Sequence, residues 1–183
     1  MHKIRTDAAV FLWLALGLLL LPLSWLFAAA VAAMIHELGH LVAAKIRKVP
    51  WQELAIGAGG MVMYMGCMTD KDTILISFAG PGASLLLCSL LYIWPQVAIC
   101  GVVQGLYNLL PIYPLDGGRV LYALIGDRAA SVEKVFIFMI FIAGIVGTIR
   151  TELGISPLLI ALLICVRAIK RKFPCKEALI GVQ

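Results

Sequence analysis

The sequence predicts an all-α polytopic membrane protein, with about six transmembrane helices and a short membrane-associated β segment between helices two and three. Composition is the first observation: 62% of the 183 residues are hydrophobic, 14% are charged, and the mean hydropathy is +1.01. A soluble domain is about half apolar and about a quarter charged, so we expect this chain in a lipid bilayer. The other two observations are the spacing of its apolar runs and the basic clusters beside them.

Six apolar runs account for the predicted helices. They cover about residues 8–21, 24–46, 73–94, from 96 into the NLLPIYPLDGGR segment, 132–149 and 155–169. Pro22 separates the first two runs, because proline interrupts a helix. A cleaved signal peptide is the competing interpretation. However, cleavage after Ala30 would leave about 14 residues before Lys45, too few to cross a membrane.

The segment between the second and third runs differs in composition. Its sequence VPWQELAIGAGGMVMYMG is rich in glycine and in residues that favour strands. This pattern predicts one or two short strands within residues 50–66, at the membrane surface or against the helices. Gly57, Gly59 and Gly60 would provide a turn or a close approach of the backbone.

Basic residues gather beside the apolar runs rather than on one binding face. The clusters lie at residues 2–5, 45–48, 119–128 and 167–176. Because cytoplasmic loops of membrane proteins are enriched in lysine and arginine, this arrangement predicts that both termini are cytoplasmic. It also accounts for the net charge of +5, so no nucleic-acid partner is expected.

The stretch AAMIHELGHLVAA, residues 32–44, places two histidines and a glutamate inside an apolar run. His36 and His40 are four residues apart, so on a helix both imidazoles project from one face. This spacing suits two nitrogen ligands of a zinc ion, with Glu37 beside them as the base that takes a proton from the attacking water. The alternative is a histidine pair hydrogen-bonded inside a helix bundle, with Glu37 paired to one of them.

A catalytic zinc needs a third protein ligand and one open position for water. The five cysteines have no metal-ligand spacing, and we expect them to pack as small apolar side chains. Asp116 is the best candidate, because it ends an apolar run at the same predicted depth as the histidines. The prolines and glycines of NLLPIYPLDGG favour irregular backbone, which occurs at membrane depth only inside protein or beside water. A simple turn residue is the alternative role for Asp116, and Glu53 or Asp127 would then be the next ligand candidates.

These motifs together resemble the site-2 protease family of intramembrane zinc metalloproteases. The family's order is HExxH in an early span, a motif like AGPGAS in the next and one like NLLPIYPLDGGR in the one after. The last motif is especially similar to the bacterial subgroup of stage IV sporulation protein FB. The resemblance covers about residues 8–125.

The resemblance implies one zinc ion per chain, bound by His36, His40 and Asp116, with Glu37 as the general base. Asn108 matches the asparagine of the family's third motif, which implies that it positions the substrate or polarises its carbonyl. Members of this subgroup often carry a cytosolic nucleotide-sensing CBS domain after the last span. We expect none here, because the sequence ends at Gln183.

We therefore expect a single integral membrane metalloprotease domain over residues 1–183. Its core covers 8–125, helices five and six cover about 132–169, and a short basic cytoplasmic tail covers 170–183. The expected reaction is hydrolysis of a peptide bond within or next to a membrane segment of a membrane-associated protein.

The family resemblance also implies partners and a location. It implies a sigma-factor precursor or an anti-sigma factor as substrate, a membrane regulatory protein as a further candidate partner, and the bacterial cell membrane as location. The active site is expected near the cytoplasmic side. The alternatives are a metal transporter, disfavoured because the sequence shows no repeated halves, and an inactive relative that binds membrane partners, disfavoured by the intact motif residues.

Overall fold

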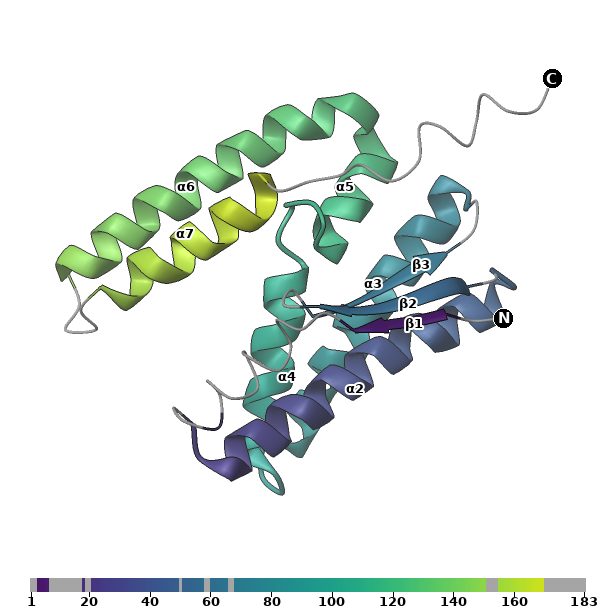
Figure 1. Ribbon diagram of the computed structural model, residues 1–183, viewed down its shortest axis with the longest axis horizontal. Coiled ribbons are helices and arrows are strands. Elements are labelled where there is room, and N and C mark those ends of the chain that lie inside the picture. The colour runs from purple at the N-terminus through teal and green to yellow at the C-terminus, as the bar shows by residue number, and fades with distance from the viewer. Residues whose placement is uncertain are drawn as a thin grey trace.

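A computed structural model (Figure 1) describes residues 3–6, 18, 21–49, 51–57, 60–65, 68–150 and 155–169. The elements in chain order are β1 Lys3–Thr6, α2 Leu23–Ile46, β2 Trp51–Gly57, β3 Gly60–Met65, α3 Asp70–Leu86, the 3₁₀ turn η1 Leu87–Leu90, α4 Pro95–Asn108, α5 Asp116–Ile125, the 3₁₀ turn η2 Gly126–Arg128, α6 Ala129–Arg150 and α7 Ser156–Ile169. The predicted first helix, except residues 18 and 21, and the tail 170–183 lie outside the described residues.

Helix α2 buries small and polar side chains and exposes large apolar ones, as membrane helices do. Its buried residues recur at every fourth position and are small or polar: Ala28, Ala32, His36, His40 and Ala44. Its exposed residues include a second stripe of large apolar side chains with the same spacing: Met34, Leu38, Val42 and Ile46. A soluble helix would bury the large apolar stripe instead. In a bilayer, lipid covers this stripe, and the polar groups face other helices.

Three helical segments among the described residues are long and apolar enough to cross a membrane: Leu23–Ile46, Asp70–Leu90 and Asp116–Arg150. The chain is therefore an integral membrane protein. The predicted six spans are not confirmed. Helix α4 has 14 residues, a length of about 21 Å, whereas the hydrocarbon core is about 30 Å thick. Helix α7 also has 14 residues.

Helices α2, α3 and α4 pack together closely. The buried contacts of α2 with α4 and η1 are made by Ala28, Ala32, Leu87 and Val97. Between α2 and α3 the backbones nearly touch, because a Cβ on Gly39 would lie 2.5 Å from the carbonyl oxygen of Ala79. Glycine at this position therefore sets the distance between the two helices that flank the site.

The structure contains a three-stranded sheet in the order β1-β2-β3. Strands β2 and β3 lie in the segment where the sequence predicts short strands, and they pair antiparallel, with Gly57 opposite Gly60. Strand β1 pairs parallel to β2 and was not expected. The described chain is therefore not all-α. Four residues, two of them basic, are too few to show the alternation that identifies a strand. The association of the sheet with a membrane stays a prediction.

The fourth predicted helix does not reach Asp116. Helix α4 ends at Asn108, residues 109–115 are irregular, and Asp116 is the first residue of a new helix, α5. The two prolines of this segment stop the helix, since proline lacks the N–H that a helix interior requires.

The irregular segment 109–115 rests on the last two helices. Ile112 and Leu115 are buried there against side chains of α6 and α7, namely Phe136, Ile137, Ile140 and Ile164. Helices α6 and α7 form a hairpin (Figure 1) in which Gly144 and Gly147 let them approach closely at Ala161 and Pro157. This hairpin meets the rest of the described molecule mainly through α5, η2 and the 109–115 segment.

Candidate metal centre

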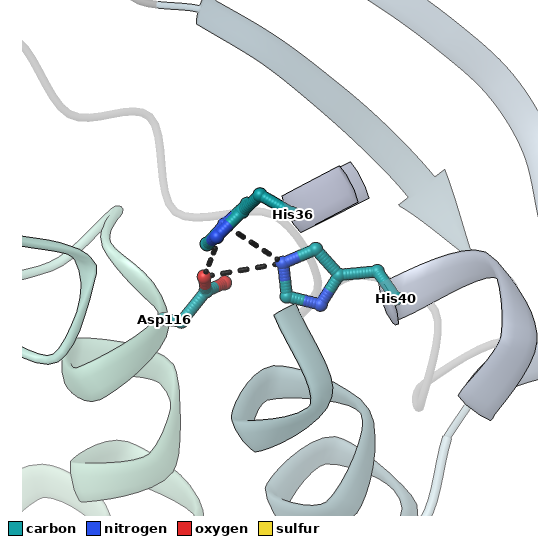
Figure 2. Close-up of side chains that lie close together, drawn as sticks. All are labelled: His36, His40 and Asp116. Atoms are coloured by element: carbon teal, nitrogen blue, oxygen red, sulfur yellow. Dashed lines mark hydrogen bonds and ion pairs between the residues drawn. The ribbon is translucent and has the colours of Figure 1, made fainter. Parts of the chain in front are cut away.

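The structure brings together the three residues that the sequence proposes as zinc ligands. Figure 2 shows the side chains of His36 and His40, from α2, converging with that of Asp116, from α5. The Oδ2 atom of Asp116 lies 3.2 Å from the Nε2 atom of each histidine. The two Nε2 atoms are themselves 3.2 Å apart. All three residues are buried, with exposed fractions of 3%, 7% and 5%.

Hydrogen bonds from α3 orient both imidazole rings. The Nδ1 atom of His40 is 2.7 Å from the carbonyl oxygen of Ile76, which only accepts, so Nδ1 donates. In the neutral ring, Nε2 therefore presents a lone pair toward Asp116. The Nδ1 atom of His36 is hydrogen-bonded to Ser84 Oγ at 2.9 Å. Metal-ligating histidines typically use their second nitrogen in this way.

This arrangement fits a metal ion on chemical and geometric grounds. The Oδ2 atom of Asp116 and the Nε2 atoms of His36 and His40 point at a common centre. Electron-rich atoms arranged in this way repel one another unless a cation or a proton lies between them. For zinc–nitrogen bonds of 2.0–2.1 Å, tetrahedral ligands are roughly 3.3 Å apart, close to the observed 3.2 Å. Within the described residues, these three make up the group of histidine, cysteine and acidic side chains able to hold a metal. Two imidazoles and one carboxylate leave a fourth position for water.

Glycines of two motifs make room for the ligands. In AGPGAS, a Cβ on Gly80 would overlap Nε2 and Cε1 of His40, so the ring lies directly on the backbone of α3. At the start of α5, a Cβ on Gly117 would meet the carbonyl oxygen of Leu109, and one on Gly118 would meet the backbone of Ile112. Both glycines therefore allow the first turn of α5 to pack against the irregular segment that precedes it.

The second oxygen of Asp116 faces a cation. Arg119 Nη1 lies 4.0 Å from Asp116 Oδ1, and the arginine side chain is 28% exposed. The two oxygens of Asp116 therefore have different neighbours: Oδ2 faces the two histidines and Oδ1 faces Arg119. The sequence analysis used Arg119 only as part of a basic cluster, because a spacing of three residues on a helix does not by itself indicate a role at a metal site.

The remaining predicted residues lie beside this group. Glu37 is half-buried on α2 and has the charges of both histidines, Asp116 and Arg119 around it. No hydrogen bond ties its carboxylate to another described residue. Asn108 is the last residue of α4, and its Nδ2 donates to the carbonyl oxygen of Gln104 at 3.1 Å. The structure does not place Asn108 in the metal-binding group. The sequence analysis missed Ser84, although it ends the AGPGAS motif.

The chain is similar in sequence to known proteins. A zinc metalloprotease of Methanocaldococcus jannaschii is 28% identical over 112 residues, which cover 54% of this chain and 33% of that protein. Stage IV sporulation protein FB of Bacillus subtilis is 31% identical over 138 residues, which cover 64% of this chain and 46% of that protein. The chain thus spans less than half the length of these curated relatives. No family model matches the chain.

The fold is shared with a solved protease. The site-2 protease from M. jannaschii superposes with a TM-score of 0.70, covering 96% of this chain and 94% of that one at 20% sequence identity. The chain thus shares the fold of that site-2 protease. Together with the curated relatives, this supports the site-2 protease family that the motifs predict and is consistent with the subgroup of stage IV sporulation protein FB.

Proposed function

We propose that the chain is an intramembrane zinc metalloprotease, which hydrolyses a peptide bond within or next to a membrane segment of a membrane-associated protein. The observation that carries this proposal is the buried triangle of His36, His40 and Asp116 between apolar helices. Two relatives that share sequence or fold with the chain are named as proteases, which supports the same reaction. A metal transporter is not favoured, since neither the relatives nor the fold point to transport.

His36, His40 and Asp116 would hold one zinc ion per chain. When bound at such a site, zinc lowers the pKa of water toward neutrality and polarises the scissile carbonyl. The contacts of His36 with Ser84 and of His40 with Ile76 hold the imidazoles in their positions throughout the reaction. The depth of the group among apolar helices limits the access of bulk water.

Glu37 would act as the general base. It follows His36 directly on α2, and it is half-buried with no hydrogen bond to other described residues. Its carboxylate is therefore available to accept a proton from the attacking water and to deliver it to the leaving amine. In both steps the carboxylate of Glu37 must face the scissile bond. Its place on α2, next to His36 and His40, would allow this.

The substrate would bind in extended form, because a helical segment hides its peptide bonds. Strand β3 lies at one edge of the described sheet, and an extended segment can pair with such an edge by β-augmentation. Asn108 would position the substrate or polarise its carbonyl, as the family resemblance implies. A sigma-factor precursor or an anti-sigma factor is the proposed substrate class, as the family resemblance implies.

The proposed orientation places both termini and the metal centre toward the cytoplasm of a bacterial cell. It follows from the basic clusters, one of which, at residues 45–48, comes directly after the histidines on α2. Single cysteines in a background without native cysteines would test it. We expect a membrane-impermeant reagent added outside to label positions 24 and 96, and not position 48. The opposite labelling would invert the topology and the side of product release.

The decisive experiment is co-expression with candidate membrane-tethered substrates. Glu37→Gln keeps the size and polarity of the side chain but cannot accept the proton, so we expect cleavage to fall by at least about a hundredfold. Zinc content should stay unchanged, because Glu37 is not a ligand. Cleavage by this variant at a nearly normal rate would contradict the assignment of Glu37. A wild-type protein without zinc would contradict the proposed reaction itself.

A further inference from the structure

A fully buried carboxylate lies outside the metal centre. Glu133 is on α6, inside the apolar segment Asp116–Arg150, and none of its surface is exposed. Burial of a carboxylate is strongly unfavourable unless it is well paired, and ionisable residues within membrane segments usually have a function. The proposed reaction does not use Glu133 directly, because its ligands and base lie on α2 and α5.

Glu133 is connected to the helix that carries the third ligand. The hydroxyl group of Tyr122, on α5, donates a hydrogen bond to Glu133 Oε2 at 3.2 Å. The ring of Tyr122 also packs edge-on against Tyr113, with ring centroids 6.0 Å apart and an interplanar angle of 76°. Tyr113 belongs to the irregular segment directly before Asp116. These three side chains therefore join α6, α5 and the 109–115 segment.

Apart from the two histidine nitrogens beside Oδ2, Asp116 has few direct side-chain restraints of its own. The N-terminus of α5 has no side-chain capping bond, and the described partner of the second carboxylate oxygen is Arg119 at 4.0 Å. The carboxylate lies about 5 Å from the helix axis, so a rotation of α5 by about 10° would move it by about 1 Å. A shift of this size is enough to impair a catalytic site by about a hundredfold.

We propose that Glu133 is a positioning residue for the metal centre. Acting through the Tyr122 hydroxyl, it fixes the rotation of α5 and so places Asp116 Oδ2 beside the two histidine nitrogens. The inference rests on one part of the proposed function, namely that the centre binds zinc. It assigns to α6 a role in the site, although no residue of α6 is a ligand.

The test measures zinc affinity of the purified full-length protein by competition with a chelator. Tyr122→Phe removes only the hydroxyl and keeps the ring against Tyr113. We expect about tenfold weaker zinc binding, similar to the loss of an outer-shell partner at a metal site. Glu133→Gln should weaken binding in the same direction. Tyr92→Phe is the matched control, because Tyr92 is 98% exposed, and we expect wild-type affinity.

A second measurement separates positioning from general stability. In a background of Asp116→Asn, Tyr122→Phe should have no further effect on zinc affinity, since the path through Asp116 is already broken. The visible spectrum of the cobalt-substituted protein should change in Tyr122→Phe and stay unchanged in Tyr92→Phe.

Two results would overturn the proposal. The first is wild-type zinc affinity in both Tyr122→Phe and Glu133→Gln. The second is that Tyr122→Phe lowers zinc affinity by the same factor in the wild-type and Asp116→Asn backgrounds. Zinc binding by the wild-type protein is measured first, because a wild-type protein that binds no zinc would instead refute the proposed function.

Discussion

The two halves of the candidate metal centre are built in different ways. The histidine half, His36 and His40, lies on one continuous helix, and each ring has its own hydrogen-bond partner on α3. The aspartate half, Asp116, lies at the start of a ten-residue helix after an irregular segment. The histidines are therefore placed by local helix geometry and direct bonds, whereas the aspartate is placed by the path of the chain, by the packing of α5 on α3 and by the packing of α6 and α7 against the irregular segment.

This difference indicates how each half responds to change. Backbone near the histidines is held by close packing of α2 and α3, in which Gly39 and Gly80 leave no room for a side chain. Backbone before Asp116 is held by Ile112 and Leu115, which are buried mostly against α6. Movement of the α6–α7 hairpin would thus reach the aspartate before it reached the histidines.

The largest effects should come from removal of a ligand in either half. We expect His40→Ala and Asp116→Ala each to weaken zinc binding by more than about a hundredfold, beyond the loss typical of an outer-shell partner, and to abolish cleavage. Metal analysis of the purified variants measures this. Met34→Ala, a lipid-facing change on α2, is the control and should keep its zinc. Full zinc retention in Asp116→Ala would exclude it as ligand and turn the search to Glu53 or Asp127.

A smaller effect should come from the backbone that supports the histidine half. A Cβ at position 80 would overlap the His40 ring, whereas a Cβ at position 82 would have no atom within 4 Å. We expect Gly80→Ala to weaken zinc binding by about ten- to a hundredfold, because the ring must shift, and Gly82→Ala to have no effect. Both glycines occupy the same helix and the same motif, so equal zinc affinities would show that the His40 ring tolerates displacement.

The smallest losses of zinc affinity should come from removing one supporting contact in each half. Ser84 is fully buried and bonded to His36 at 2.9 Å, whereas Arg119 is partly exposed and 4.0 Å from Asp116. We expect Ser84→Ala to weaken zinc binding about tenfold and Arg119→Gln at most about threefold. Added salt should reduce only the second effect, because exposed charges are screened. A larger loss in Arg119→Gln would mean that the aspartate half depends on direct charge pairing more than on packing.

The histidine half was predictable from the sequence. The spacing of four residues between His36 and His40 determines that both rings share one face of a helix, whatever the rest of the chain does. The length and polarity of the run around them predicted α2 as a membrane helix, and the observed bounds, Leu23–Ile46, lie within a residue of those expected. Two short strands were also predictable from the composition of residues 50–66.

Other features depended on tertiary structure. Asp116 is 76 positions after His40 in the chain, so its side chain meets the histidines only if the irregular segment turns α5 toward α2. The sequence indicated that this segment was irregular, yet it did not show that a new helix begins at Asp116. The pairing of β1 with β2 and the bond between Tyr122 and Glu133 likewise join residues that no short period connects.

The sequence by itself thus determined the apolar character of the chain, the helix that carries HExxH and the chemical types of the proposed ligands, because these follow from composition and from the fixed repeat of the helix. Tertiary structure decided where the third proposed ligand lies, which glycines must stay without a side chain, and which partners orient the rings. The physical reason is that these features depend on close packing between distant segments, where a displacement of one ångström separates contact from overlap.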